Sequence, residues 1–260
     1  MFETINYEVK RNVAVIQFNR PSTFNAFIEQ MNREITEAFK SAGRDSNVRC
    51  VVITGSGKAF CAGQDLGEVL DLKEEMDFSK FLRERYNPMV LQIQKIEKPV
   101  IAAVNGVAAG AGMSLALACD LRLASEKASF VNAFVNIGLV PDSGGCYFLP
   151  RIVGLGKAME LAFTGARLSA KEAKEIGLVN HVFTEENFLD EVMAYAEKLA
   201  SLPTKGIGLI KRTMYQGLNM NLEETLEYEA FSQEIAGNTQ DHREGVQAFV
   251  EKRKPHFTGK

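Results

Sequence analysis

The sequence predicts an α/β fold in which short apolar strands alternate with helices. Continuous apolar runs at 13–18, 50–54 and 100–104 are typical of strands that are covered on both faces. Between these runs lie segments in which apolar residues recur at helical spacing. The alternation of the two patterns favours βαβ crossovers, and therefore a sheet that is largely parallel.

The first elements follow directly from the printed order of residues. The strand at 13–18 is ended by Asn19-Arg20-Pro21. Apolar residues then recur at helical spacing from Phe27 to Phe39, so we expect a helix there. The run Cys50–Thr54 predicts a second strand, and the glycine turn at 55–58 closes it.

The middle of the chain repeats this alternation. A helical stretch around 80–97 leads into the strand at 100–104. Small and aliphatic residues at 110–119 predict a tightly packed helix, and residues 121–124 are strand-like again. We find no internal repeat and no low-complexity segment.

The composition changes after about Pro203, where long charged helical patterns at 222–235 and 243–253 replace the short strands. We therefore expect a core of residues 1–200 and a helical C-terminal subdomain of residues 201–260, which is within the usual range of domain sizes. Helices with large apolar residues on one face often pack on a neighbouring subunit, so the pattern favours a homo-oligomer.

Composition limits the classes of partner. The formal net charge of -3 gives no reason to expect a nucleic acid or an anionic membrane as partner. The longest apolar stretch, near 100–117, contains Asn105 and three glycines, so we do not interpret it as a membrane span. With no basic and apolar leader at the N-terminus, a cytoplasmic location is expected. The cysteines form no C-x-x-C pair, so we expect reduced core thiols and no structural metal. They are Cys50, Cys61, Cys119 and Cys146.

Three segments rich in small residues carry the candidate chemistry: 59–66, 105–112 and 138–145. The second runs directly into a predicted helix, whose free N–H groups can bind an anion or a developing oxyanion. It lacks the ending of a Walker A loop and the spacing of a Rossmann fingerprint. Taken singly, each segment is also compatible with an ordinary turn.

Together with flanking landmarks, these segments resemble the crotonase (enoyl-CoA hydratase/isomerase) superfamily over nearly the whole chain. That resemblance implies a spiral of ββα units with a C-terminal helical trimerisation region. It also implies an acyl-CoA thioester as substrate, no permanently bound cofactor or metal, and a homotrimer or dimer of trimers. The landmarks, in order, are Asn19-Arg20-Pro21, Gly63-Gln64-Asp65, Gly110-Ala111-Gly112, Gly138 to Gly145, Thr164-Gly165, Gly177-Leu178-Val179 and Phe249 to Pro255.

The resemblance also implies roles for particular residues. The backbone amides of Gln64 and Ala111 would be the two oxyanion donors, with Gly110 beside the second. Ala62 and Leu66 would lie beside the adenine and pantetheine of coenzyme A. At the other end of the sequence, Phe257 and Lys260 would reach the nucleotide. Asp65 adjoins the donor segment, and we interpret its side chain as a helix cap or turn acceptor rather than a second catalyst.

The sequence departs from the hydratase pattern at two positions. Where hydratases of this type carry two glutamates that activate water, this chain has Ser114 and Phe134, which we interpret as pocket walls. Asp142 remains nearby, in a segment that most resembles the ring-epoxide isomerase branch and, next, the Δ3,Δ2-enoyl-CoA isomerases. One carboxylate suits an isomerase, since it can remove a proton as a base and return it as an acid. On local sequence alone, a structural role for Asp142 in a β-turn or as a helix cap is as well supported as a catalytic one.

We therefore expect an acyl-CoA isomerase with Asp142 as acid and base. A hydratase that has relocated its base is the second hypothesis. A non-catalytic acyl-CoA-binding subunit is the third. RNA binding is disfavoured, because the charge is nearly balanced and no basic-aromatic patch is present.

Overall fold

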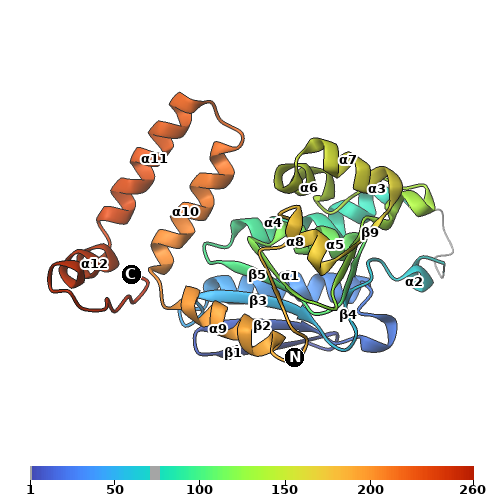
Figure 1. Cartoon of the computed structure of the whole chain (residues 1–260), viewed down its shortest axis with the longest axis horizontal. Coiled ribbons are helices and arrows are strands. Elements are labelled where there is room, and N and C mark those ends of the chain that lie inside the picture. The colour runs from blue at the N-terminus through green and yellow to red at the C-terminus, as the bar shows by residue number, and fades with distance from the viewer. Residues whose placement is uncertain (1, 71–76) are drawn as a thin grey trace.

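Two sheets organise the chain in the computed structural model, which describes residues 2–70 and 77–260 (Figure 1). The larger sheet has the order β1-β2-β3-β5-β7-β10. Its first pair is antiparallel and every other pair is parallel. The strands are β1 (Ile5–Lys10), β2 (Val13–Phe18), β3 (Cys50–Gly55), β5 (Val100–Val104), β7 (Leu121–Ser125) and β10 (His181–Phe183).

The smaller sheet has the order β4-β6-β8-β9, and only its last pair is antiparallel. Its strands are β4 (Ala59–Cys61), β6 (Val107–Ala109), β8 (Ser129–Val131) and β9 (Arg167–Ser169). In three successive units the first strand joins the larger sheet and the second joins the smaller one: β3 with β4, β5 with β6, and β7 with β8. A helical segment follows each pair, so the predicted spiral of ββα units is confirmed.

Both faces of the larger sheet are covered, as the continuous apolar runs predicted. Successive side chains of a strand point to opposite faces. Accordingly, Val51 and Ile53 of β3 belong to one buried cluster, whereas Cys50 and Val52 belong to another. The first cluster includes residues of α1 (Glu29–Arg44), α4 (Asn87–Lys95) and α5 (Ala111–Ala118), and the second includes residues of α9 (Phe188–Ala200).

Shorter helices complete the core region. A π-helical segment at Leu82–Tyr86 leads into α4. A 3-10 turn at Ala133–Ile137 follows β8. The remaining helices of this region are α2 (Leu66–Leu70), α3 (Phe78–Phe81), α6 (Gly145–Val153), α7 (Leu155–Thr164) and α8 (Ala170–Glu175).

The first predicted helix begins two residues later than its apolar pattern suggested. Phe27 forms an isolated parallel bridge with Gln64, and α1 starts at Glu29. Phe27 is fully buried, so its place in the apolar pattern reflects the core and not the helix.

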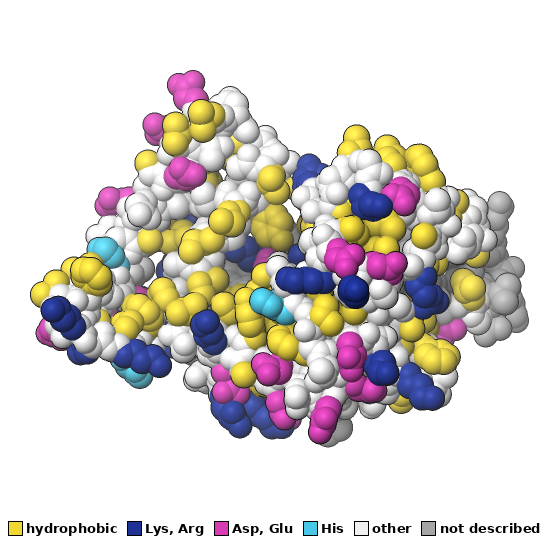
Figure 2. Space-filling model, viewed as in Figure 1, with side chains coloured by type: hydrophobic (Ala, Val, Ile, Leu, Met, Phe, Trp, Pro, Cys, Tyr) yellow, Lys and Arg dark blue, Asp and Glu magenta, His cyan; other side chains and the backbone are white. Residues whose placement is uncertain are grey.

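The C-terminal region consists of α10 (Thr204–Gly217), α11 (Leu222–Gly237) and α12 (Gln240–Val250). The pair α10 and α11 projects from the sheets in Figure 1. A buried ion pair fastens its base to the core, because Lys211 Nζ lies 2.8 Å from Asp120 Oδ2 and 2.9 Å from the carbonyl oxygen of Ile93. Figure 2 shows hydrophobic side chains gathered along these helices, and exposed members include Met214, Leu222, Phe231, Phe249 and Val250.

Three of the four cysteines are buried thiols, as expected. Cys50, Cys61 and Cys119 are buried and unpaired, whereas Cys146 is exposed on α6 and was wrongly expected in the core. Among residues 2–70 and 77–260, no helix is long and apolar enough to cross a membrane.

Candidate active site

The turns that follow β4, β6 and β8 meet at one edge of the smaller sheet. These three strands are parallel neighbours, with Ala59 opposite Val107 and Val107 opposite Ser129. Their carboxyl ends therefore point the same way, and the chain leaving each strand emerges beside the next. This topology brings Gly63-Gln64, Gly110-Ala111 and the segment around Phe134 together, although they are far apart in the sequence.

The first two turns approach so closely that only glycine fits between them. A Cβ on Gly63 would lie 3.0 Å from the carbonyl oxygen of Ala109 and 3.5 Å from the Ala111 nitrogen, and its φ is +93°. A Cβ on Gly112 would lie 2.3 Å from the carbonyl oxygen of Cys61. Helix α5 therefore begins in contact with the end of β4.

Two backbone amides lie at this contact without a partner. The Phe27 N–H donates to Gly63 O at 2.7 Å and the Asp65 N–H donates to Phe27 O at 2.9 Å, which fixes the peptide units on either side of Gln64. The N–H groups of Gln64 and of Ala111, the first residue of α5, donate to no other residue in the described part of the chain. A pair of fixed amides, one at a helix N-terminus, can stabilise negative charge on a substrate oxygen.

Asp142 lies in the turn before α6 and does not cap that helix. The Gly145 N–H donates to the Asp142 carbonyl at 2.8 Å, and Gly144 is the N-cap residue. The carboxylate accepts a hydrogen bond from Ser143 Oγ at 2.8 Å. Burial raises the pKa of the Asp142 carboxyl, and that single hydrogen bond only partly opposes the rise. The expected β-turn is present, but the side chain is free to act on something else.

Two buried side chains, Ser114 and Phe134, lie near these turns. A Cβ on Gly145 would lie 2.8 Å from Ser114 Oγ, so the turn that carries Asp142 packs on α5. Phe134 is buried, and its Cζ would lie 3.9 Å from a Cβ on Gly110. Neither Ser114 nor Phe134 can remove a proton at neutral pH, whereas Asp142, in the turn before α6, carries a carboxylate.

Comparisons with known proteins show the family of the chain. The family model for enoyl-CoA hydratase/isomerase matches residues 8–260. The chain belongs to the enoyl-CoA hydratase/isomerase family. Its resemblance to the crotonase superfamily is thereby confirmed.

Relatives in this family carry different activities. The chain is 43% identical to a 1,2-epoxyphenylacetyl-CoA isomerase of Escherichia coli K12, over 100% of both chains. It is 37% identical to a crotonyl-CoA hydratase of Syntrophomonas wolfei, over 100% of this chain and 99% of the relative. The crystal structure of an enoyl-CoA hydratase from Bacillus anthracis matches with a TM-score of 0.93 and 35% identity, over 99% of this chain and 100% of that one.

The turn Gly63-Gln64-Asp65, which carries the first free amide and is called the donor turn below, is flanked by predicted site residues. Ala62 and Leu66 are exposed on either side of the turn. Asp65 Oδ2 pairs with Arg20 Nη2 at 3.0 Å, and its Oδ1 accepts from the Gly67 N–H at 3.1 Å. The side chain of Asp65 therefore braces the turn, as interpreted from the sequence, whereas its partner Arg20 was not foreseen.

Within one chain the structure does not bring Phe257 and Lys260 to the other predicted site residues. Asp241 holds the C-terminal residues by accepting from the N–H groups of Thr258 at 2.7 Å and Gly259 at 2.8 Å. Figure 1 places the C-terminus near the opposite end of the molecule from α2, which follows the first donor turn. The expectation that these two residues reach the nucleotide therefore does not hold for a single copy.

One further side chain at the site was missed. Tyr86, at the end of the π-helical segment, is buried and donates its hydroxyl proton to Gln64 Oε1 at 2.6 Å. Nothing in the local sequence distinguishes it from a core aromatic residue, because its partner lies 22 residues earlier.

Proposed function

We propose that this chain is an acyl-CoA isomerase that moves a double bond, or isomerises a ring epoxide, through an enolate. The observation that carries the proposal is the half-buried Asp142 carboxylate, which is not used as a helix cap and lies in a turn that packs on α5 at Ser114. A thioester α-proton becomes accessible to such a base only if the charge that develops on the carbonyl oxygen is stabilised. The paired amides of Gln64 and Ala111 are suited to that task.

For a 3-enoyl-CoA the proposed steps balance with one carboxylate. Asp142 takes the proton from C2, and the electron pair moves onto the thioester oxygen to give a dienolate. The protonated Asp142 then returns the proton to C4, which leaves the double bond between C2 and C3. A raised pKa helps one group act first as base and then as acid.

The rest of the substrate would lie along the exposed side of the donor turn. Ala62 and Leu66 would contact adenine and pantetheine, and the coenzyme A thioester would enter as substrate, with no permanently bound cofactor. Phe257 and Lys260 would then come from a neighbouring copy, which requires an oligomer.

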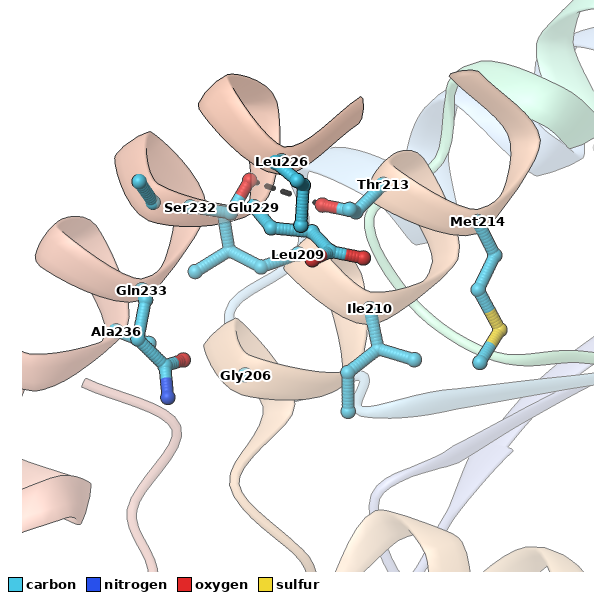
Figure 3. A pocket seen from close by; sticks show the side chains of 11 residues that line it. Gly206, Leu209, Ile210, Thr213, Met214, Leu226, Glu229, Ser232, Gln233 and Ala236 are labelled. Atoms are coloured by element: carbon cyan, nitrogen blue, oxygen red, sulfur yellow. Dashed lines mark hydrogen bonds between the residues drawn. The ribbon is translucent and has the colours of Figure 1, made fainter. Parts of the chain in front are cut away.

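The proposed assembly is a homotrimer or a dimer of trimers that uses the C-terminal helices. A cavity of about 600 Å³ between α10 and α11 is lined by Ile210, Met214 and Leu226, among others (Figure 3). Its lining includes none of the active-site residues above, so we assign this apolar groove to subunit packing and not to chemistry.

The test is parallel turnover of a 3-enoyl-CoA and a 2-enoyl-CoA by the wild-type protein, with products separated by chromatography. We expect the double bond to move without uptake of water. Hydration of the 2-enoyl-CoA would instead support a hydratase with a relocated base, the activity that the name of the Syntrophomonas relative carries. Binding of both esters without turnover would favour a non-catalytic subunit.

The raised pKa of Asp142 predicts the pH dependence. The first step needs the ionised carboxylate, so kcat/KM should fall as pH drops through the pKa of the free enzyme. Because burial raises that pKa, the midpoint of the acid limb should lie above about 4, the ordinary value for aspartate. Initial rates at saturating and limiting substrate across pH would show it. A midpoint at or below the ordinary value would contradict the assignment.

A further inference from the structure

Both polar atoms of the Gln64 carboxamide are hydrogen-bonded, although only the backbone amide of this residue has a role in the proposed chemistry. Its Oε1 accepts from the Tyr86 hydroxyl at 2.6 Å. Its Nε2 donates to Glu68 Oε2 at 2.9 Å and to the Asp65 carbonyl at 3.2 Å. A carboxamide that is fixed in this way restrains the backbone that carries it.

The contacts of Gln64 extend into a network that joins three parts of the chain. Glu68 accepts from Arg85 Nη1 at 3.2 Å and from the Glu29 N–H at 3.1 Å. Arg85 also donates to Glu29 Oε2 at 2.7 Å. The start of α1, the donor turn with α2, and the π-helical segment are therefore tied together around Gln64.

Tyr86 is the rigid member of this network. Its ring lies edge-on to Phe27, with centroids 5.7 Å apart, and beside Phe81 at 5.9 Å. The residue is only 1% exposed, and burial raises the pKa of its hydroxyl well above the usual value, so the group stays a neutral donor. Phe27 itself brackets the Gln64 peptide through its backbone hydrogen bonds, so the ring and the hydroxyl of Tyr86 support the same turn from two directions.

We infer that Tyr86 is a positioning residue, which sets the Gln64 amide for oxyanion stabilisation through the Gln64 side chain. A single π-helical turn frequently marks a functional position in a helix, and here it presents this tyrosine to the donor turn. The inference rests on the proposed oxyanion hole, but not on the identity of the acid or base.

The test uses a probe that reports the oxyanion hole without turnover. A 3-oxobutyryl-CoA bound to the protein ionises to an enolate with its own near-ultraviolet absorbance, so a pH titration of the complex gives the apparent pKa of the bound ester. Tyr86→Phe removes the hydroxyl and keeps the ring. We expect the apparent pKa to rise by about one unit, equal to about tenfold weaker enolate stabilisation, which is less than the ~10²–10³-fold cost of losing a donor.

Steady-state kinetics should show the same loss of enolate stabilisation. In Tyr86→Phe, kcat for isomerisation should fall about tenfold while KM changes little, because a donor matters most in the transition state. The matched control is Tyr215→Phe, which removes the hydroxyl of a half-buried tyrosine that bonds to Asp120 Oδ1 at 3.4 Å and takes no part in the network around Gln64. That variant should leave the apparent pKa of the bound ester unchanged.

Gln64→Met gives an independent test, because it keeps the backbone amide of residue 64 but removes the side-chain oxygen that accepts the Tyr86 hydrogen bond. It should reproduce the shift, and the double variant should show little more than either single change. An unchanged apparent pKa in Tyr86→Phe and Gln64→Met would overturn the inference. If the wild type itself bound the probe without stabilising its enolate, the oxyanion hole proposed above would fail first.

Discussion

Replacing Asp142 with asparagine should lower kcat for double-bond movement by about 10³-fold. The amide has nearly the same shape but cannot accept the C2 proton, and general acid–base catalysis typically contributes about 10²–10⁴-fold. KM should change much less, because in the proposed binding mode the ester makes its contacts elsewhere, along the turn around Gln64. Single-turnover and steady-state rates with a 3-enoyl-CoA would measure both quantities.

The same variant should fold at least as well as the wild type. Burial raises the folded-state pKa of Asp142, so ionising it opposes folding, and this cost appears as pH rises through that pKa. Asparagine removes the cost, so the Tm at neutral pH should not fall. Asp142→Asn that isomerises at the wild-type rate would show that another group carries the proton. Persistent hydration in the variant would favour the hydratase.

Gly112→Ala should damage both stability and activity, although alanine normally strengthens a helix by about 1 kcal/mol relative to glycine. The added Cβ would lie 2.3 Å from the Cys61 carbonyl oxygen and 2.8 Å from the Cys61 Cβ. Backbone and a buried side chain cannot yield easily, so the first turn of α5 must move away from β4, at a cost of about 1–3 kcal/mol. The Ala111 amide moves with it, and kcat should fall about 10²-fold, since a displacement of about 1 Å can cost that much.

Thermal unfolding and turnover of the same preparation would measure the two effects. Gly156→Ala in the first turn of α7 is the matched control, because no atom lies within 4 Å of its added Cβ. We expect that control to keep the wild-type rate and to keep or slightly raise the Tm. Gly112→Ala with wild-type stability and activity would mean that the two turns are not in the tight contact described above.

The strands β2, β3 and β5 of the larger sheet could be predicted from the sequence because burial on both faces favours apolar residues, whereas β1, which is exposed at most positions, was not predicted. The apolar runs at 13–18, 50–54 and 100–104 match β2, β3 and β5 to within one residue. The strands β4, β6, β8 and β9 have three residues each, too few to display a period of two. They form because neighbouring strands supply their hydrogen bonds, which is a property of the assembled sheet.

The candidate site also has a part that the sequence predicts and a part that only the fold shows. Its glycines were recognisable, and their resemblance to a family pointed to Gln64 and Ala111. The proximity of these two residues follows from the parallel pairing of β4 and β6. The role of Tyr86 and the distance of Phe257 from the donor turn depend on contacts across 22 residues or more, which no local pattern reports.

By itself, the sequence determined the α/β class, the buried strands β2, β3 and β5, the family, and the presence of Asp142 in a chain that lacks the two glutamates of the hydratases. These depend on residue type and order, which is what hydrophobic burial and a catalytic motif require. Only the tertiary structure decided that Asp142 is half-buried and does not cap α6, that Asp65 forms an ion pair with Arg20, and that the Tyr86 hydroxyl donates to Gln64. Hydrogen bonds and desolvation depend on which groups meet in space, and that meeting is set by the packing of the whole chain.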